Sequence, residues 1–161
     1  MNRDTTVHIR PATPADIPRI MSLERQSPTA GHWTEGLYRQ VFRPEGPVRL
    51  LLVAESRDLK PGAEGPSILG FLIAHHLAPE WELENLVVAP GARRKGLGTC
   101  LLEALLHAAR ETNGSVFLEV RESNAPARAL YENAGFKQTG RRHSYYKSPS
   151  EAAILYRWTV A

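Results

Sequence analysis

The chain has 161 residues, of which 42% are hydrophobic and 23% charged, a composition and length that suit one globular domain with a sizeable core. Its 20 basic and 17 acidic residues leave a net charge of +3, which favours an anionic ligand but lacks the basic, aromatic-interleaved stripe of nucleic-acid binders. No apolar run is long enough to cross a bilayer, so we expect residues 1–161 to form a single domain that binds neither nucleic acid nor membrane.

The N-terminal part is predicted to contain one strand and two helices. Residues 7–12 alternate between apolar and polar and predict a short strand. Thr13 as N-cap and Pro14 at the first helical position begin a helix with apolar residues at helical spacing. After a turn-rich break, Thr34 caps a second short helix that extends to residue 42.

Three strands follow, at residues 48–56, 67–77 and 81–88. The first two are joined by the loop 57–66, whose glycines and prolines predict a hairpin tip and to which we assign no function.

The C-terminal half alternates helices and strands. Apolar periodicity predicts a helix from 96 to 112, and a buried-type strand follows at 115–120. A second helix spans 123–135 and ends on a glycine at the C′ position, and two strands at 136–146 and 152–160 complete the chain. The order βααβββαβαββ predicts an α/β (α+β) fold with a mixed central sheet of about seven strands and four helices on both faces.

The single cysteine, Cys100, cannot form an internal disulfide, and the N-terminal segment lacks the apolar centre of a signal peptide. We therefore expect a cytoplasmic protein. Cys100 falls within an apolar helical pattern, which favours a small core residue over a nucleophile.

The stretch "VVAPGARRKGLGTCLL" (87–102) carries a candidate anion site. Arg93, Arg94 and Lys95 precede Gly96 and Gly98 at the start of the long helix. The first amides of a helix have no intrahelical partner and the helix dipole favours negative charge there, so a diphosphate fits. The pattern is neither a Walker P-loop nor a dinucleotide fingerprint, and a solvated basic turn remains an alternative.

Further segments of the chain narrow the identity of the anion that this site would bind. Arg-x-x-Gly-x-Gly between a strand and a long helix resembles the pyrophosphate-binding motif of the GNAT acetyltransferases. "SNAPARALYENAGF" (123–136) resembles the second signature of that family, a helix that an Asn caps and that ends in Gly-Phe. "LEVRESN" and "RRHSYY" are similar to the RimI branch, whose members acetylate the N-terminus of a ribosomal protein. "HWTEGLY" resembles the Pro-Trp-Ser segment of that branch, although His32 precedes Trp33 here; the resemblance covers residues 7–158.

The resemblance implies a GNAT fold and acetyl-CoA as co-substrate, with direct attack of an amine on the thioester in a ternary complex. The implied partner is a protein or peptide N-terminus, such as that of a ribosomal protein. Asn124 would contact the cofactor, cap its helix, or do both. The implied cofactor-binding residues are Leu86, Val87, Val88, Arg93, Arg94, Lys95, Gly96, Leu97, Gly98, Thr99 and Asn124.

Two carboxylates are candidates for the base that takes the amine proton. Glu119 aligns with the glutamate of the RimI branch and is anomalous in the apolar strand "SVFLEV"; the alternative is an ion pair with Arg121 or Arg128. Glu84 stands where many GNAT enzymes keep their glutamate, but it alternates with apolar residues as a solvated strand face would. We predict Glu119 as the base and hold Glu84 in reserve.

Tyr131 is the predicted general acid, because it matches the tyrosine of the family in "ALYENAGF". A phenol with a pKa of about 10 stays protonated at neutral pH and can donate to a thiolate whose conjugate acid has a pKa of about 8.5. An aromatic ring that only packs on the sheet is the alternative.

Four aromatic residues are expected to line the acceptor site: Trp33, Tyr38, Tyr145 and Tyr146. The alternative for the two C-terminal tyrosines is ordinary strand packing. An α-amine, with a pKa of about 7.7–8.0, is easier to deprotonate than lysine at about 10.4, which is consistent with an N-terminal acceptor.

Two other functions remain open at this point: a GNAT enzyme for a small-molecule amine or a lysine side chain, and a non-catalytic acyl-CoA-binding module. His75 and His76 point to opposite faces of a strand, and we predict no metal site.

Overall fold

The computed structural model describes residues 6–58, 62, 65–147 and 150–160. The strands are β1 (Val7–Pro11), β2 (Arg49–Ser56), β3 (Ser67–Leu77), β4 (Glu80–Val88), β5 (Val116–Arg121), β6 (Lys137–Tyr146) and β7 (Glu151–Trp158). The helices are α1 (Ile17–Arg25), α2 (Glu35–Gln40), α3 (Leu97–Glu111) and α4 (Ala125–Asn133), with short 3-10 turns at Pro14–Asp16 and Pro90–Ala92. The predicted element order is confirmed, with small shifts at the ends. Half of the loop 57–66, namely residues 59–61 and 63–64, lies outside the described residues.

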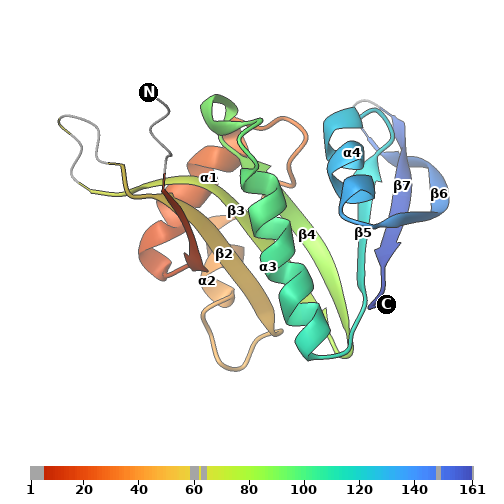
Figure 1. Cartoon of the computed structure of the whole chain (residues 1–161), viewed down its shortest axis with the longest axis horizontal. Coiled ribbons are helices and arrows are strands. Elements are labelled where there is room, and N and C mark those ends of the chain that lie inside the picture. Colours follow the sequence, from red (N-terminus) through yellow and green to blue (C-terminus); the bar gives the residue numbers. More distant parts are fainter. Residues whose placement is uncertain (1–5, 59–61, 63–64, 148–149, 161) are drawn as a thin grey trace.

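The seven strands form one mixed sheet in the order β1-β2-β3-β4-β5-β7-β6. All neighbours are antiparallel except β4 and β5, which are parallel. Among the described residues, β4 and β5 pair only at Trp81–Val116 and Glu82–Phe117. The two strands then diverge towards the end at which α3 begins (Figure 1), which leaves the facing edge of β4 free for a ligand.

Helices cover both faces of the sheet, as predicted, and each face has its own hydrophobic core. On one face α3 packs through Leu101, Leu102 and Leu105, all fully buried, and α4 adds Tyr131. On the other face α1 contributes Ile17 and the other apolar residues of its helical stripe. The sheet is therefore a middle layer (Figure 1).

A β-bulge interrupts β4. Ile73 of β3 faces Asn85, whereas its neighbour Ala74 faces Leu83, so Glu84 is an extra residue on β4. A bulge bends its strand and re-aims side chains. Glu84 therefore has no directly facing residue on β3, although burial still alternates along β4.

The bulge also changes which positions of β4 face each hydrophobic core. Before it, Trp81 and Leu83 belong to the core beneath α3, and beyond it Val87 belongs to the core beneath α1. The second half of β4 thus presents a different set of side chains to each layer than the sequence pattern predicts.

Cys100 is exposed, so the prediction of a core cysteine is wrong. The residue lies in the first turn of α3, outside the stripe that faces the sheet. Among the described residues, no helix combines the length and the apolar character that crossing a membrane requires.

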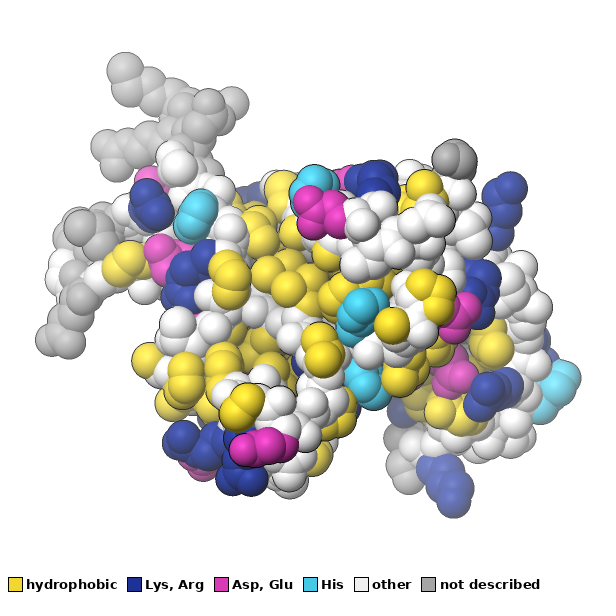
Figure 2. Space-filling model, turned by 90° about the horizontal axis from the view of Figure 1, so that it is seen from below, with side chains coloured by type: hydrophobic (Ala, Val, Ile, Leu, Met, Phe, Trp, Pro, Cys, Tyr) yellow, Lys and Arg dark blue, Asp and Glu magenta, His cyan; other side chains and the backbone are white. Residues whose placement is uncertain are grey.

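The end of the sheet opposite to the start of α3 carries exposed hydrophobic residues. Val48 and Leu77 are 64% and 45% exposed, and a backbone hydrogen bond of 2.8 Å from His76 to Val48 joins the two strand ends. Figure 2, which views the molecule from this end, shows hydrophobic side chains over much of the face with histidines among them. This apolar face lies away from the start of α3.

We expect Leu105→Ala to lower the free energy of unfolding by about 2–5 kcal/mol, because it leaves a cavity in the fully buried core beneath α3. Urea unfolding followed by circular dichroism measures the loss. Glu103→Ala, on the exposed side of the same helix, is the control and is expected to change stability by about 0.5 kcal/mol or less. Equal losses for the two variants would contradict the assigned core face.

Candidate active site

A groove of about 580 Å³ runs between the C-terminal end of β4 and the N-terminal ends of α3 and α4. We call it the outer groove. Ten of the eleven residues predicted to bind the cofactor line it: Leu86, Val87, Val88, Arg93, Arg94, Gly96, Leu97, Gly98, Thr99 and Asn124. Lys95 is exposed and is not among the lining residues.

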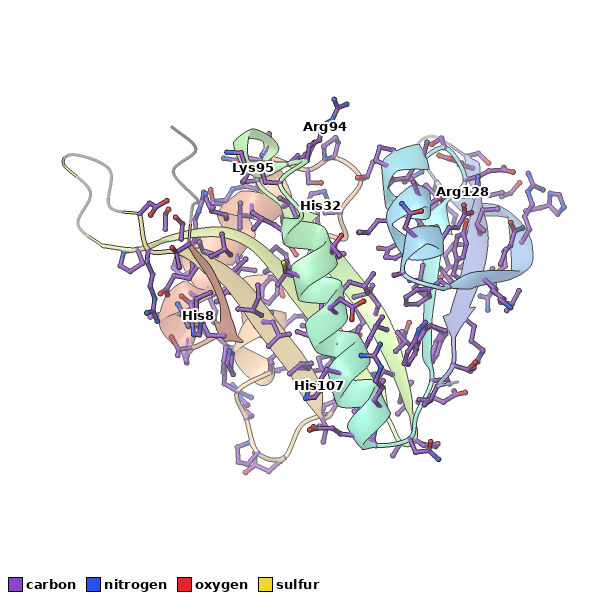
Figure 3. The ribbon with its side chains drawn as sticks, viewed as in Figure 1. His8, His32, Arg94, Lys95, His107 and Arg128 are labelled. Carbon is purple, nitrogen blue, oxygen red and sulfur yellow. The ribbon has the colours of Figure 1, made fainter. Side chains whose placement is uncertain are left out.

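The turn before α3 has the geometry that an anion site needs. Gly96 is the N-cap, with φ at +79°, a value at which a side chain is strained. The helix ladder starts with the Cys100 amide, which donates to the Gly96 carbonyl at 3.0 Å, so the three amides from Leu97 to Thr99 have no intrahelical acceptor. Arg94 and Lys95 lie at this end of the molecule (Figure 3), and together these groups favour a phosphate.

The two sequence motifs meet at Gly98. A Cβ at this position would lie 3.3 Å from Cδ2 of Leu130 in α4, so the glycine allows α3 and α4 to approach closely. This contact brings the basic turn and the second signature to the same groove. Arg93 is exposed, and its Nε donates to the Val88 carbonyl at 3.2 Å, which holds the guanidinium near the end of β4.

A second cavity, of about 190 Å³, continues the outer groove between β4 and β5. We call it the inner cavity. It shares Leu86, Asn124 and Tyr131 with the outer groove, so the two cavities adjoin, and we call them together the passage. The inner cavity brings together four residues predicted for catalysis or acceptor binding, Glu84, Glu119, Tyr131 and Tyr146.

Glu119 on β5 has a side chain that is 25% exposed. Its Oε1 lies 3.3 Å from Nη2 of Arg142, which β6 supplies. A hydrogen bond from the Tyr145 hydroxyl also reaches the Glu119 carboxylate, and this bond raises the pKa of Tyr145. The cationic partner is therefore Arg142, whereas the sequence suggested Arg121 or Arg128.

Glu84, the bulged residue, is held at both oxygens by Arg49 of β2. Nε of Arg49 lies 2.9 Å from Oε2, and Nη2 lies 3.2 Å from Oε1. The guanidinium also stacks 5.1 Å from the ring centroid of Trp33. With its side chain only 15% exposed, Glu84 does not lie on a solvated strand face, which was the alternative open in the sequence.

Tyr131 lies at the junction of the outer groove and the inner cavity and is 8% exposed. Its ring packs on Phe136 and Tyr156, with centroids 5.6 and 6.3 Å away. Burial raises the pKa of this phenol above its ordinary value, so the hydroxyl keeps its proton at neutral pH. Tyr131 is therefore a protonated phenol at the border of both cavities.

Asn124 is the N-cap of α4, where its Oδ1 accepts a hydrogen bond of 3.3 Å from the Ala127 amide. It also lines both cavities. The predicted N-cap is thus confirmed, and the same side chain borders the passage.

The four predicted acceptor aromatics are not equivalent. Tyr146 lines the inner cavity, and Tyr145 is 47% exposed at its rim above Glu119. Tyr38 is fully buried and donates to Glu24, so the prediction that it lines the acceptor wall is wrong. Trp33 stacks on Tyr38 at 5.4 Å and does not line the inner cavity, which Thr29, Ala30 and Gly31 border on this side.

The described residues contain one group that could hold a metal ion, which the sequence did not indicate. His75, Glu82 and Glu84 have ligand atoms within 4.8 Å of one another, because β3 and β4 pair across this point. Burial and the neighbouring Glu84 raise the pKa of Glu82. Arg49 already neutralises Glu84, so the group does not require an ion.

Comparison with known proteins agrees with this geometry. The acetyltransferase (GNAT) family matches residues 17–136. The [ribosomal protein bS18]-alanine N-acetyltransferase of Salmonella typhimurium is 36% identical over 146 residues, covering 87% of this chain and 88% of that protein. A Mycobacterium leprae protein is 33% identical over 147 residues, but the chain spans only 38% of its length.

A solved structure extends the likeness to the fold. The crystal structure of the Escherichia coli ribosomal-protein-S18-alanine N-acetyltransferase matches with a TM-score of 0.76 and 28% identity, covering 97% of this chain and 95% of that one. With a family match that covers most of the described elements, the chain belongs to the GNAT family and is an acetyl-CoA-dependent N-acetyltransferase.

Proposed function

We propose that the protein transfers the acetyl group of acetyl-CoA to the N-terminal α-amine of a protein, such as a ribosomal protein. The observation that carries the proposal is the single passage from the α3 amides through Tyr131 to Glu119. The name of the Salmonella relative, an N-acetyltransferase of an alanine in a ribosomal protein, supports the choice of acceptor.

The cofactor is proposed to lie along the outer groove. Its pyrophosphate would accept hydrogen bonds from the first amides of α3, where Arg94 adds charge. The pantetheine would follow Leu86 to Val88, on the edge of β4 that β5 leaves unpaired. The thioester would then reach the junction where Asn124 and Tyr131 border both cavities.

The proposed reaction is a direct transfer. The amine nitrogen attacks the thioester carbonyl carbon, and the C–S bond breaks as the new C–N bond is completed. Glu119 accepts the amine proton, directly or through a water, and Tyr131 gives a proton to the departing thiolate. Glu84 is less suited to the role of base, because Arg49 occupies both its oxygens.

The acceptor is proposed to enter the inner cavity from the side opposite the cofactor. Tyr146 and the rim residue Tyr145 border this entrance from β6, and Thr29, Ala30 and Gly31 border it from the loop between α1 and α2. Wall elements on two sides suit an extended peptide end, of which the first residue reaches Glu119.

Peptide acetylation tests the proposal. Purified protein is incubated with acetyl-CoA and peptides that begin with Ala, Ser or Met, and thiol release is measured. The matched controls are the same peptides with a blocked N-terminus and an internal lysine, and polyamines. We expect turnover only with free α-amines. Turnover confined to lysine or small amines would contradict the proposed acceptor, and acetyl-CoA binding without turnover on any amine would support a binding module instead.

A further inference from the structure

The proposed acetyl transfer does not use one buried carboxylate, that of Glu24. It lies behind residues 29–31, which border the inner cavity and which we call the acceptor wall. Glu24 of α1 is 2% exposed, and burial raises its pKa. It accepts hydrogen bonds from the Tyr38 hydroxyl, from the Trp33 amide at 3.2 Å and from Nδ2 of Asn85 at 3.4 Å. A buried carboxylate is costly unless it is fully hydrogen-bonded, so this arrangement requires its partners to stay in place.

Asn85 links Glu24 to the acceptor wall through two hydrogen bonds of its side-chain amide. It is 7% exposed, and the same Nδ2 that donates to Glu24 also donates to the Gly31 carbonyl at 3.0 Å. Gly31 and its neighbours Thr29 and Ala30 line the inner cavity. Asn85 therefore attaches the loop between α1 and α2 to β4 at Gly31, and Glu24 attaches the same loop to α1 at Trp33.

A second connection runs through the bulge residue next to Asn85. Glu84 is held by Arg49, and Arg49 stacks on Trp33, whose amide is bound to Glu24. The two consecutive residues at the β4 bulge are thus both immobilised by the α1–α2 side of the molecule. The bulge positions this loop against the cavity.

We propose that Glu24 and Asn85 are positioning residues that hold the acceptor wall, residues 29–31, at the distance from Glu119 that the first residue of the acceptor requires. The inference rests on the proposed place of the acceptor in the inner cavity. Glu24 lines neither cavity and acts through the loop, whereas Asn85 both bonds to Gly31 and lines the inner cavity itself. Tyr38→Phe, which changes only the Glu24 side, therefore separates the positioning role from direct contact with the acceptor.

Asn85→Ala tests this directly, because it removes the bond to Gly31 without adding bulk. We expect the KM for an Ala-initial peptide to rise about tenfold, the effect of one lost buried hydrogen bond. The KM for acetyl-CoA should stay within about twofold, because Asn85 does not line the outer groove and, of the wall residues 29–31, only Thr29 does. Discrimination between Ala-initial and Met-initial peptides should also weaken, since a loosened wall admits a larger first residue.

Tyr38→Phe is the second variant, because it removes one donor to Glu24 and keeps the ring stacked on Trp33. It should change the acceptor KM in the same direction by a smaller factor. This variant keeps the inference testable if Asn85→Ala unfolds, which thermal denaturation will show.

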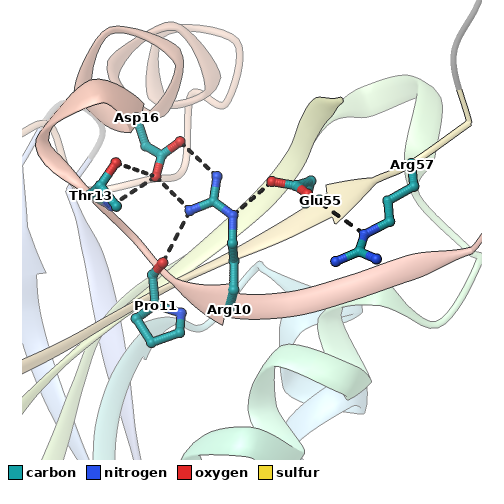
Figure 4. A network of polar contacts seen from close by, with 6 residues as sticks. All are labelled: Arg10, Pro11, Thr13, Asp16, Glu55 and Arg57. Atoms are coloured by element: carbon teal, nitrogen blue, oxygen red, sulfur yellow. Dashed lines mark hydrogen bonds and ion pairs between the residues drawn. The ribbon is translucent and has the colours of Figure 1, made fainter. Parts of the chain in front are cut away.

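The matched control is Asp16→Asn in the network of Figure 4. Asp16 is 8% exposed and is bound by Arg10 at 2.8 Å and by the Thr13 amide at 2.8 Å, away from both cavities. It should lower thermal stability and leave the acceptor KM unchanged.

Two results would overturn the inference: an acceptor KM within twofold of wild type in Asn85→Ala and Tyr38→Phe, or an equal rise in Asp16→Asn. If the wild type acetylates another amine and no peptide N-terminus, the proposed function fails. The same KM comparison is then made with that amine, so the two failures remain distinguishable.

Discussion

Tyr131→Phe should lower kcat about 100-fold while the affinity for CoA stays within about twofold. Burial holds the phenol protonated next to the junction of the two cavities, and general acid catalysis typically contributes at least this factor. Phenylalanine keeps the packing on Phe136 and Tyr156 but cannot give a proton to the departing thiolate. Steady-state thiol release measures kcat, and calorimetric titration with CoA measures binding.

Tyr156→Phe is the matched control for this prediction. Its hydroxyl donates to Glu132 at 2.6 Å and accepts from Arg128, and the residue borders neither cavity. It should keep wild-type turnover. Wild-type turnover in Tyr131→Phe would remove the phenol from the reaction and leave it the role of a packed aromatic.

Glu119→Gln should lower kcat/KM for an α-amine acceptor about 100-fold at neutral pH, with the loss shrinking as the pH rises. Below the amine pKa of about 7.7–8.0 the acceptor is mostly an ammonium ion and needs a base; above it the amine is already neutral. The rate of the variant should therefore climb with pH until the acceptor has lost its proton. Rate profiles from pH 6 to about 9.5 measure the difference.

Glu84→Gln is the isosteric control for Glu119→Gln, since both carboxylates line the inner cavity. Because Arg49 holds both oxygens of Glu84, we expect Glu84→Gln to affect the acceptor KM more than the pH profile of the rate. A pH-dependent loss in Glu84→Gln, with an unchanged profile in Glu119→Gln, would transfer the role of base to Glu84.

Elements whose signals are local were predictable from the sequence. Thr34 caps α2 by accepting from the Leu37 amide at 3.2 Å, and Gly135 ends α4 with φ at +98°, both within one turn of the residues they serve. The helical period of α3 predicted the side that packs on the sheet, apart from Cys100 in its first turn. Because such signals depend on neighbours in the chain, the order and type of the elements followed from them.

The cofactor side of the passage was predictable for the same reason. Turn, glycines and helix start are contiguous in the chain, and ten of the eleven residues named for the cofactor line the outer groove. The lining of the inner cavity was less predictable, because it combines residues of the α1–α2 loop, β4, β5, α4 and β6. Tyr38 illustrates the difference: its aromatic ring suggested a binding surface, and only packing against Glu24 and Trp33 places it in the core.

The sequence by itself determined the element order, the anion-binding start of α3, and the presence of Glu119 and Tyr131 in motifs that resemble an acetyltransferase. The tertiary structure decided which polar side chains pair with one another. Arg49 reaches Glu84 across 35 residues of chain, and Asn85 reaches Glu24 across 61, with no periodic or local signal for either pair. It also decided the β4 bulge, because strand register depends on which partner strand lies alongside. Helix caps and apolar periods depend on residues that are close together in the chain. The shape of the acceptor wall depends instead on contacts that exist only after the sheet and both helical layers have packed.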